Sequence, residues 1–191
     1  MSPRRIVVAL TGASGAAIGM RVVGLLAAHG GFETHLVVTR AGERTLAHEA
    51  GPGALAALER AVARRHAVDD IGASLASGSF RTEAMIVAPC SIRALSAIAT
   101  SNATDLVARA ADVHLKERRR LVLLVREAPL HLGHLRAMTA VTEYGAIVLP
   151  PVPSFYNRPE TVADLVDDIA RRALATALPD FGTAVAEWVG D

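Results

Sequence analysis

Small, hydroxyl-bearing and charged residues follow each of five short apolar runs in this sequence. The five segments are Thr11 to Gly15, Thr39-Arg40, Pro89-Cys90-Ser91, Arg126-Glu127 and Pro150 to Arg158. Runs of this length and composition are typical of buried parallel strands. In an open parallel sheet, ligands bind beyond the carboxyl ends of the strands, so we expect these segments to meet at one site.

The first of these segments, Gly12-Ala13-Ser14-Gly15, combines small residues with a hydroxyl group. Such a loop lets backbone amides and a helix N-terminus approach an anion or a planar ring, although glycines at such turns are often only structural. A nicotinamide-type Gly-x-Gly-x-x-Gly motif is absent, and Thr39 stands where an acidic residue would bind a ribose. The pattern therefore favours flavin mononucleotide (FMN) over NAD.

The segment Pro89-Cys90-Ser91-Ile92-Arg93 would place hydroxyl and amide donors at a second helix start. These donors suit a phosphate or a flavin edge, and they also suit a simple helix cap. Cys90 could be a nucleophile, but no His follows it in a recognisable catalytic signature, so we interpret it as an inert packing residue.

Two groups of charged residues are candidates for binding a phosphate ester. Arg109 and Lys116 are seven residues apart, so they share a helix face and could present two cations to one phosphate, although a solvated helix face is the ordinary explanation. Arg126 and Glu127 directly follow an apolar run, where opposite charges would be costly to bury without a role. A carboxylate beside cations is a plausible acid/base group.

Four further residues have weaker signals. His131 and His134 are three apart, which permits a metal site but supplies only two ligands, so we favour helix packing. Tyr156 lies in a predicted turn and could donate a hydrogen bond to a phosphate. Arg172, near the end of the last predicted helix, also fits an ordinary surface position.

The elements that must position these residues alternate along the chain. Strands are predicted at 6–10, 34–38, 84–88, 121–125 and 146–149, and helices at 16–29, 41–50, 54–65, 92–100, 106–116, 131–143 and 161–177. Residues 71–80 are small, polar and glycine-containing, and we interpret them as a functional loop. The pattern predicts an α/β fold, a three-layer sandwich with a mostly parallel sheet between helices.

Composition limits the possible functions. The 191 residues are 51% hydrophobic, which fits one globular domain over 1–191. The 20 Lys and Arg balance 19 Asp and Glu, so nonspecific nucleic-acid binding is poorly supported. One cysteine fits a reducing compartment, and no apolar run is long enough for a signal peptide or a membrane span, so we expect a cytoplasmic protein.

Taken together, seven motifs resemble those of the UbiX-type flavin prenyltransferases, in the same order and spacing from residue 6 to about residue 188. They are Thr-Gly-Ala-Ser-Gly-Ala (11–16), Ala-Ser-Gly-Ser-Phe (76–80), Pro-Cys-Ser-Ile-Arg (89–93), Arg-Ala-Ala-Asp-Val (109–113), Leu-Lys-Glu-Arg-Arg (115–119), Arg-Glu-Ala-Pro-Leu-His-Leu (126–132) and Pro-Pro-Val-Pro-Ser-Phe-Tyr-Asn-Arg-Pro (150–159). The combination is more specific than any single motif.

This resemblance implies a Rossmann-like, flavodoxin-type subunit in a homo-oligomer, usually a dodecamer, with FMN and dimethylallyl phosphate bound at a subunit interface. It implies no metal. The implied reaction joins the dimethylallyl group to N5 and C6 of reduced FMN, and the prenylated FMN serves a UbiD-type decarboxylase in ubiquinone biosynthesis or aromatic-acid decarboxylation. The sequence does not decide between a monophosphate and a diphosphate donor.

The resemblance also implies residue roles. Residues expected to bind FMN are Gly12, Ala13, Ser14, Thr39, Ser91, Ile92, Arg93, Ala94 and Arg126. Residues expected to bind the prenyl phosphate are Arg109, Lys116, Tyr156 and Arg172. Glu127 would assist proton transfer, with Ser14, Arg109 and Lys116 as its catalytic neighbours.

Two departures from the family pattern concern fine contacts. Ala94 stands where a hydroxyl residue is common, and residues 102–105 differ from the expected loop. Three other functions remain: a flavin-dependent cysteine decarboxylase, whose catalytic His and Asn-rich motif are not found; a non-catalytic flavin-binding partner; and a short-chain dehydrogenase, which lacks its Tyr-x-x-x-Lys pair.

Overall fold

Six parallel strands form the sheet at the centre of the protein. The computed structural model describes residues 4–182. The strands are β1 (Arg4–Leu10), β2 (Phe32–Val38), β3 (Arg64–His66), β4 (Ala84–Cys90), β5 (Arg120–Val125) and β6 (Ile147–Val148), in the order β3-β2-β1-β4-β5-β6. Every neighbouring pair is parallel, so all carboxyl ends lie at the same edge of the sheet.

The strand order reverses direction between β1 and β4. From β1 the chain proceeds outward to β2 and β3, and from β4 it proceeds the other way to β5 and β6. Without the short edge strand β3, the remaining five strands have the flavodoxin-like order 2-1-3-4-5. The predicted Rossmann-like, flavodoxin-type α/β fold is therefore confirmed. The gap beyond the ends of β1 and β4 is where such sheets bind ligands.

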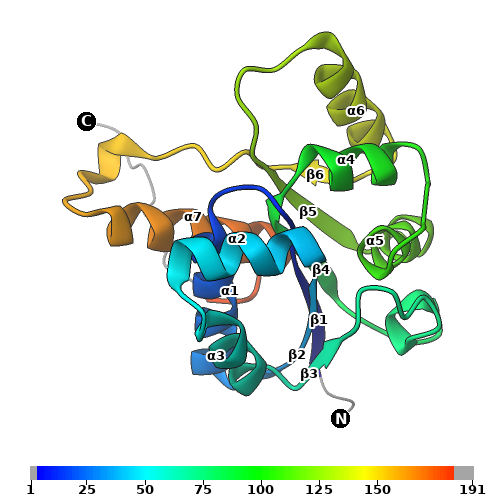
Figure 1. Ribbon diagram of the computed structural model, residues 1–191, viewed down its shortest axis with the longest axis horizontal. Coiled ribbons are helices and arrows are strands. Elements are labelled where there is room, and N and C mark those ends of the chain that lie inside the picture. Colours follow the sequence, from blue (N-terminus) through cyan, green and yellow to red (C-terminus); the bar gives the residue numbers. More distant parts are fainter. Residues whose placement is uncertain (1–3, 183–191) are drawn as a thin grey trace.

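Helices cover both faces of the sheet (Figure 1). The helices are α1 (Ala16–His29), α2 (Arg40–Ala50), α3 (Ala54–Ala61), α4 (Ile92–Ala99), α5 (Leu106–Lys116), α6 (Leu132–Glu143) and α7 (Val162–Ala177), with short 3₁₀ turns η1 (Ser74–Ala76) and η2 (Phe155–Asn157). Helices α1, α2, α3 and α7 bury apolar residues with Ile6 and Val8, whereas α4, α5 and α6 pack on the face of Val7 and Ala9. Alternate residues of each strand thus serve opposite cores.

Helix α1 packs very closely on the sheet. A Cβ on Gly19 would lie 2.2 Å from the carbonyl oxygen of Ala88, so only glycine permits this approach. Helix α2, in contrast, lies across the carboxyl edge of the sheet and above α1 (Figure 1). Its last turn therefore stays near the loop that follows β1.

The predicted helix at 54–65 is wrong at its carboxyl end. Helix α3 stops at Ala61, Val62 is extended, and residues 64–66 form β3 beside β2. The N–H of Ala63 donates to the carbonyl of Thr34 at 3.0 Å, and the buried ring of His66 contacts His35. Pairing with the sheet edge therefore outweighs the helical pattern of the local sequence. Elsewhere the five predicted strands and the other six helices are present, with boundary differences of one or two residues.

No helix in the described part of the chain, residues 4–182, has the length and apolar character needed to cross a bilayer.

Candidate functional site

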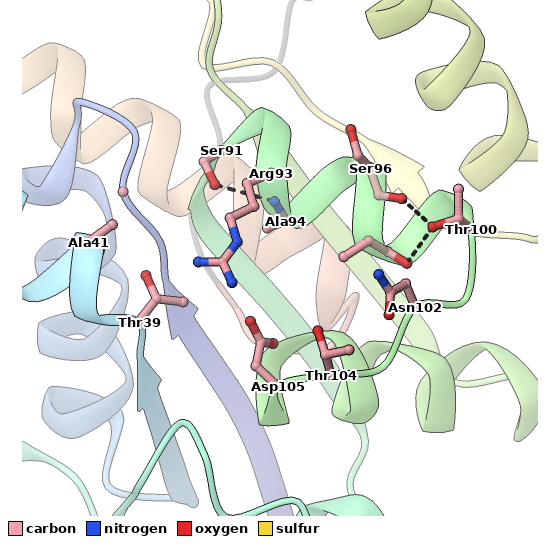
Figure 2. Close-up of a pocket in the computed structure, with 12 residues that line it drawn as sticks. Thr39, Ala41, Ser91, Arg93, Ala94, Ser96, Thr100, Asn102, Thr104 and Asp105 are labelled. Atoms are coloured by element: carbon pink, nitrogen blue, oxygen red, sulfur yellow. Dashed lines mark hydrogen bonds between the residues drawn. The ribbon is translucent and has the colours of Figure 1, made fainter.

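A cavity of about 460 Å³ lies beyond the carboxyl ends of β1 and β4 (Figure 2). Its lining comes from the loop after β1, the starts of α2, α4 and α5, and the end of α4. The lining residues are Gly12, Thr39, Ala41, Ser91, Arg93, Ala94, Ser96, Ala97, Thr100, Asn102, Thr104 and Asp105. Five of the residues expected to bind FMN therefore line one cavity at the predicted edge: Gly12, Thr39, Ser91, Arg93 and Ala94. The neighbouring Ala13 is buried, and Ile92 begins α4.

The hydroxyl group of Thr11 fixes the two strand ends relative to each other. It donates to the carbonyl of Pro89 at 2.7 Å and accepts from the N–H of Ser91 at 2.7 Å. Thr11 is buried, so these bonds are shielded from water. Sequence reasoning included Thr11 in a motif but did not assign it this role.

Four helices begin around this edge. Gly15 precedes α1 with a φ of 109°, a conformation that favours glycine. The side chains of Thr39, Ser91 and Asp105 cap α2, α4 and α5, accepting from the N–H groups of Gly42 at 3.0 Å, Ala94 at 3.4 Å and Ala108 at 2.9 Å. Helix N-termini carry partial positive charge, and those of α2 and α4, which are capped by neutral hydroxyl groups, favour an anionic ligand.

The exposed guanidinium of Arg93 adds a full positive charge to this cavity. It projects from α4 toward the space between Thr39 and Asp105 (Figure 2). A cation, several helix N-termini and small residues such as Gly12 and Ala94 match the needs of a flavin bearing one phosphate. The residues present therefore fit FMN, and the departures at Ala94 and 102–105 lie in the lining itself.

A second cavity of about 800 Å³ adjoins the first at Gly12, and it contains Ser14 and Glu49. The Glu49 carboxylate accepts from the N–H groups of Gly15 at 3.0 Å and Ala16 at 2.8 Å. Burial raises the pKa of this carboxyl, but hydrogen bonds from Ser14, Ala16 and Gly15 and the charge of Arg126 outweigh that effect, so its pKa lies below its ordinary value. Glu49 is therefore an anion at neutral pH, fixed at the start of α1.

Sequence reasoning missed Glu49. The residue lies 34 positions after Gly15 in a helix of mixed charge, and no local spacing connects it to the glycine loop. Only the placement of α2 across the sheet edge brings its last turn to α1.

Arg126 and Glu127 follow β5 at the same edge, and both side chains are exposed. The cost of burying two opposite charges after an apolar strand therefore does not arise, because the chain leaves the sheet at this point. The N–H of Arg126 donates to the carbonyl of Cys90 at 3.1 Å, and a Glu127 carboxylate oxygen accepts from the N–H of Ala128 at 3.0 Å. Arg126 is near enough to lower the pKa of Glu49.

Cys90 is fully buried at the end of β4. Burial raises the pKa of its thiol to about 12, so the nucleophilic thiolate is not populated at neutral pH. This agrees with the interpretation of Cys90 as a packing residue.

Arg109 and Lys116 lie on α5 and face the segment 76–80. The Arg109 guanidinium donates to the carbonyl of Ala76 at 3.2 Å and pairs with Asp112 at 2.8 Å. Lys116 pairs with Glu117, and both lie against Gly78, where a Cβ would lie 2.8 Å from the Lys116 nitrogen. Neither cation lines the cavity at the β1 and β4 ends.

Tyr156 and Arg172 line a third cavity, of about 530 Å³, between η2 and α7. Helix α7 packs on the sheet face of Val8, whereas α5 packs on the face of Val7. The predicted phosphate-binding residues therefore form two pairs on opposite faces of the sheet. Within one chain, the sheet separates Arg109 and Lys116 from Tyr156 and Arg172.

His131 directly precedes α6, and His134 lies in the first turn of that helix. The Nδ1 atom of His131 accepts from the N–H of Gly133 at 3.0 Å, which makes His131 the N-cap, and the two ring centroids are 3.6 Å apart. Within residues 4–182, no group of three or more His, Cys, Asp or Glu side chains has a metal-binding arrangement.

The family model of flavoproteins matches residues 1–174 of this chain. Flavin prenyltransferase UbiX of Thauera aromatica is 49% identical over 190 residues, which cover 98% of this chain and 95% of that protein. The chain belongs to the UbiX family of flavin prenyltransferases.

Two solved structures of this family superimpose on nearly the whole chain. The crystal structure of AnUbiX in complex with FMN and dimethylallyl pyrophosphate is 41% identical, with a TM-score of 0.90 and 98% coverage of both chains. A dodecameric FMN-dependent UbiX-like decarboxylase from Escherichia coli O157:H7 is 40% identical, with a TM-score of 0.90 and coverage of 98% of this chain and 100% of that one. The FMN-dependent cysteine decarboxylase TvaF is only 15% identical, with a TM-score of 0.70, and shares the fold alone.

Proposed function

We propose that this protein transfers a dimethylallyl group from dimethylallyl phosphate to N5 and C6 of reduced FMN. The observation that carries this proposal is the cavity at the ends of β1 and β4, where helix N-termini and Arg93 provide a site for a phosphate-bearing flavin. Membership of the UbiX family supports the same reaction. Reduced FMN supplies the two nucleophilic atoms, and the protein supplies binding, orientation and control of protons.

FMN would occupy the cavities that meet at Gly12. Gly12, Ala13 and Ser14 would contact it through the loop after β1, and Thr39 and Arg126 would approach from neighbouring strand ends. Ser91, Ile92, Arg93 and Ala94 would contact it from the first turn of α4. Their location around one edge of the sheet supports this assignment.

The prenyl phosphate would be bound by residues of more than one copy of the chain. Arg109 and Lys116 lie on one sheet face and Tyr156 and Arg172 on the other, so one phosphate can contact both pairs only across an interface between copies. A dodecameric relative supports a homo-oligomer, and we propose a dodecamer. Cations around the departing phosphate stabilise the charge that develops as the allylic carbon–oxygen bond breaks.

Glu127 would transfer a proton in this reaction. Its side-chain carboxylate is exposed at the carboxyl edge of the sheet, next to Arg126. A ligand can therefore reach it without first breaking a buried ion pair. Ser14, which hydrogen-bonds to the Glu49 carboxylate, would orient the reacting flavin edge together with the cations Arg109 and Lys116.

The product is a modified cofactor that this chain does not itself consume. We propose that a UbiD-type decarboxylase receives it, in ubiquinone biosynthesis or aromatic-acid decarboxylation. Residues 1–191 would form one flavoprotein domain, because both apolar cores flank a single sheet. The buried, unpaired Cys90 supports a reducing compartment, and we propose the cytoplasm.

The direct test is anaerobic incubation of the purified protein with reduced FMN and dimethylallyl phosphate, followed by mass spectrometry of the extracted flavin. A gain of one prenyl unit is expected with the wild type and not with Glu127→Gln. The matched control Glu143→Gln removes a carboxylate at the far end of α6 and should retain the product. Parallel incubation with the diphosphate distinguishes the two donors.

Two outcomes would contradict the proposal. Bound but unmodified FMN with either donor would indicate a non-catalytic flavin-binding partner. Oxidative decarboxylation of a peptidyl or pantothenoyl cysteine would indicate a cysteine decarboxylase.

A further inference from the structure

The chain from residue 150 to residue 161 connects β6 to α7, and we call this segment the strap. The short turn η2 lies in its middle (Figure 1). The strap is attached to α7 at its end by a capping box, in which Thr161 and Asp164 exchange hydrogen bonds of 3.1 and 2.8 Å. A second attachment lies within η2, where the side-chain amide of Asn157 donates to an Asp168 carboxylate oxygen at 2.9 Å.

This second attachment lies beside the cavity of about 530 Å³, which Asp168 lines. Asp168, Tyr156 and Arg172 all line that cavity. Tyr156 directly precedes Asn157, and Arg172 follows Asp168 by four residues, about one helical turn. The Asn157–Asp168 hydrogen bond therefore connects the backbone that carries Tyr156 to the helix that carries Arg172, close to both.

Within one chain, apolar packing contributes little to holding η2 in place. Val152 is 71% exposed, Phe155 is 72% exposed and Tyr156 is 52% exposed. A segment with so few buried apolar contacts opens at low free-energy cost unless polar contacts hold it. Asn157 and Asp168 are themselves only partly exposed, so their hydrogen bond is partly shielded from water.

We propose that Asn157 and Asp168 are positioning residues, which hold Tyr156 and Arg172 at the spacing needed to bind the prenyl phosphate. This inference rests on the proposed function, which assigns the prenyl phosphate to Tyr156 and Arg172. Asp168 is an anion in a cavity that receives an anion, so by charge alone it opposes binding. Its role through Asn157 gives a structural reason for a carboxylate at this position.

The opposition between charge and position gives a sharp test. Asn157→Ala and Asp168→Ala each remove the hydrogen bond. Both should raise the KM for dimethylallyl phosphate about tenfold, the effect expected for loss of a hydrogen bond to a charged group. If charge alone mattered, Asp168→Ala would lower that KM. The affinity for FMN, measured by fluorescence, should not change in either variant.

A rescue variant separates this role from general stability. In Asn157→Asp/Asp168→Asn the donor and acceptor exchange places, so the hydrogen bond and the net charge are both retained. This variant should bind dimethylallyl phosphate within about threefold of the wild type, since one charged acceptor and one amide donor remain. Glu160→Gln, which removes a carboxylate from the strap outside the cavity lining, is the control and should leave the KM unchanged.

Binding of dimethylallyl phosphate to the FMN-loaded protein is measured by calorimetry, in parallel with turnover. If the wild type binds dimethylallyl phosphate but does not prenylate FMN, the proposed function is contradicted. The Kd values of the variants then still test the positioning role of Asn157 and Asp168. A lower KM or Kd in Asp168→Ala, or an exchange variant as impaired as Asn157→Ala, would overturn the positioning role. A wild type that does not bind the donor would overturn both.

Discussion

Thr11 and Ser91 connect the two halves of the sheet at the point where its strand order reverses. The hydroxyl of Thr11, after β1, accepts from the N–H of Ser91, after β4, at 2.7 Å, and donates to the carbonyl of Pro89 at 2.7 Å. Ser91 in turn caps α4. One buried hydroxyl therefore sets the distance between the glycine loop and the first turn of α4, which are opposite walls of the proposed FMN cavity.

We predict that Thr11→Val weakens both the fold and FMN binding. Valine has nearly the same shape but leaves the N–H of Ser91 without its acceptor, which costs about 1–3 kcal/mol when the group is buried. The FMN affinity should fall about tenfold, and thermal unfolding should shift to lower temperature. Thr11→Ser retains the hydroxyl and should resemble the wild type; an equally impaired Thr11→Ser would indicate that the methyl group matters instead.

The central strands could be predicted from sequence because each is an almost unbroken apolar run. Strand β3 could not, because Arg64-Arg65-His66 has no apolar pattern and depends on its pairing with β2 and on the contact between His66 and His35. Local propensity predicts a continued helix there, and a contact with a residue far along the chain decides otherwise.

Residues of the site were predicted where they follow strands and missed where they do not. Gly12, Thr39 and Ser91 were found because the carboxyl ends of parallel strands meet at one edge. Glu49 reaches the same edge from the last turn of α2, and no periodic pattern in the sequence indicates that contact. The separation of Arg109 from Arg172 by the sheet depends on which face each helix covers, and the apolar pattern of a helix does not specify that face.

We predict that Glu49→Ala destabilises α1 in a pH-dependent way. The carboxylate accepts from two N–H groups of the first turn, and loss of such a cap costs about 1 kcal/mol. The pKa of Glu49 lies below its ordinary value, so its stabilisation is complete above the pKa of the unfolded chain and is lost as pH falls through the folded value. The difference in melting temperature between wild type and Glu49→Ala should therefore be clear at pH 7 and should shrink as the pH falls below the ordinary pKa of a glutamate.

Glu49→Gln is the matched variant for this prediction, because it keeps an acceptor oxygen and removes the charge. It should lose less stability than Glu49→Ala at neutral pH. A melting difference that does not depend on pH would show that the charge of Glu49 does not act on α1.

We predict that acid weakens the fold through the buried ring of His114. Burial lowers the pKa of His114 to about 4, despite the hydrogen bond with the carbonyl of Ala110 at 2.7 Å. At a pH between the ordinary histidine pKa of about 6.5 and the folded pKa of about 4, the unfolded chain binds a proton at His114 that the folded chain does not. The free energy of unfolding should then fall by up to about 1.4 kcal/mol per pH unit as pH decreases.

Urea unfolding at pH 7.5 and pH 5 measures this effect. His114→Gln should be less stable than the wild type at pH 7.5, since Thr82 loses its contact at 2.9 Å, but should lose less stability on acidification. Burial also lowers the pKa of His66 to about 4, so part of the pH dependence should remain in the variant. An unchanged pH dependence in His114→Gln would assign the whole effect to other groups.

The positions of Arg109 and Arg172 on opposite faces of the sheet predict complementation between inactive variants. If each site takes Arg109 from one copy and Arg172 from another, neither Arg109→Ala nor Arg172→Ala forms an intact site alone. When the two variants assemble together in equal amounts, random mixing places both wild-type residues at about a quarter of the sites. Co-expression of the two variants should therefore restore about a quarter of the prenylation rate, measured by mass spectrometry of the flavin. As the control for assembly, the Arg109→Ala/Arg172→Ala double variant is co-expressed with the wild type, and its prenylation rate is normalised in the same way. If both residues served one site from the same chain, the mixture of single variants would stay as inactive as its components.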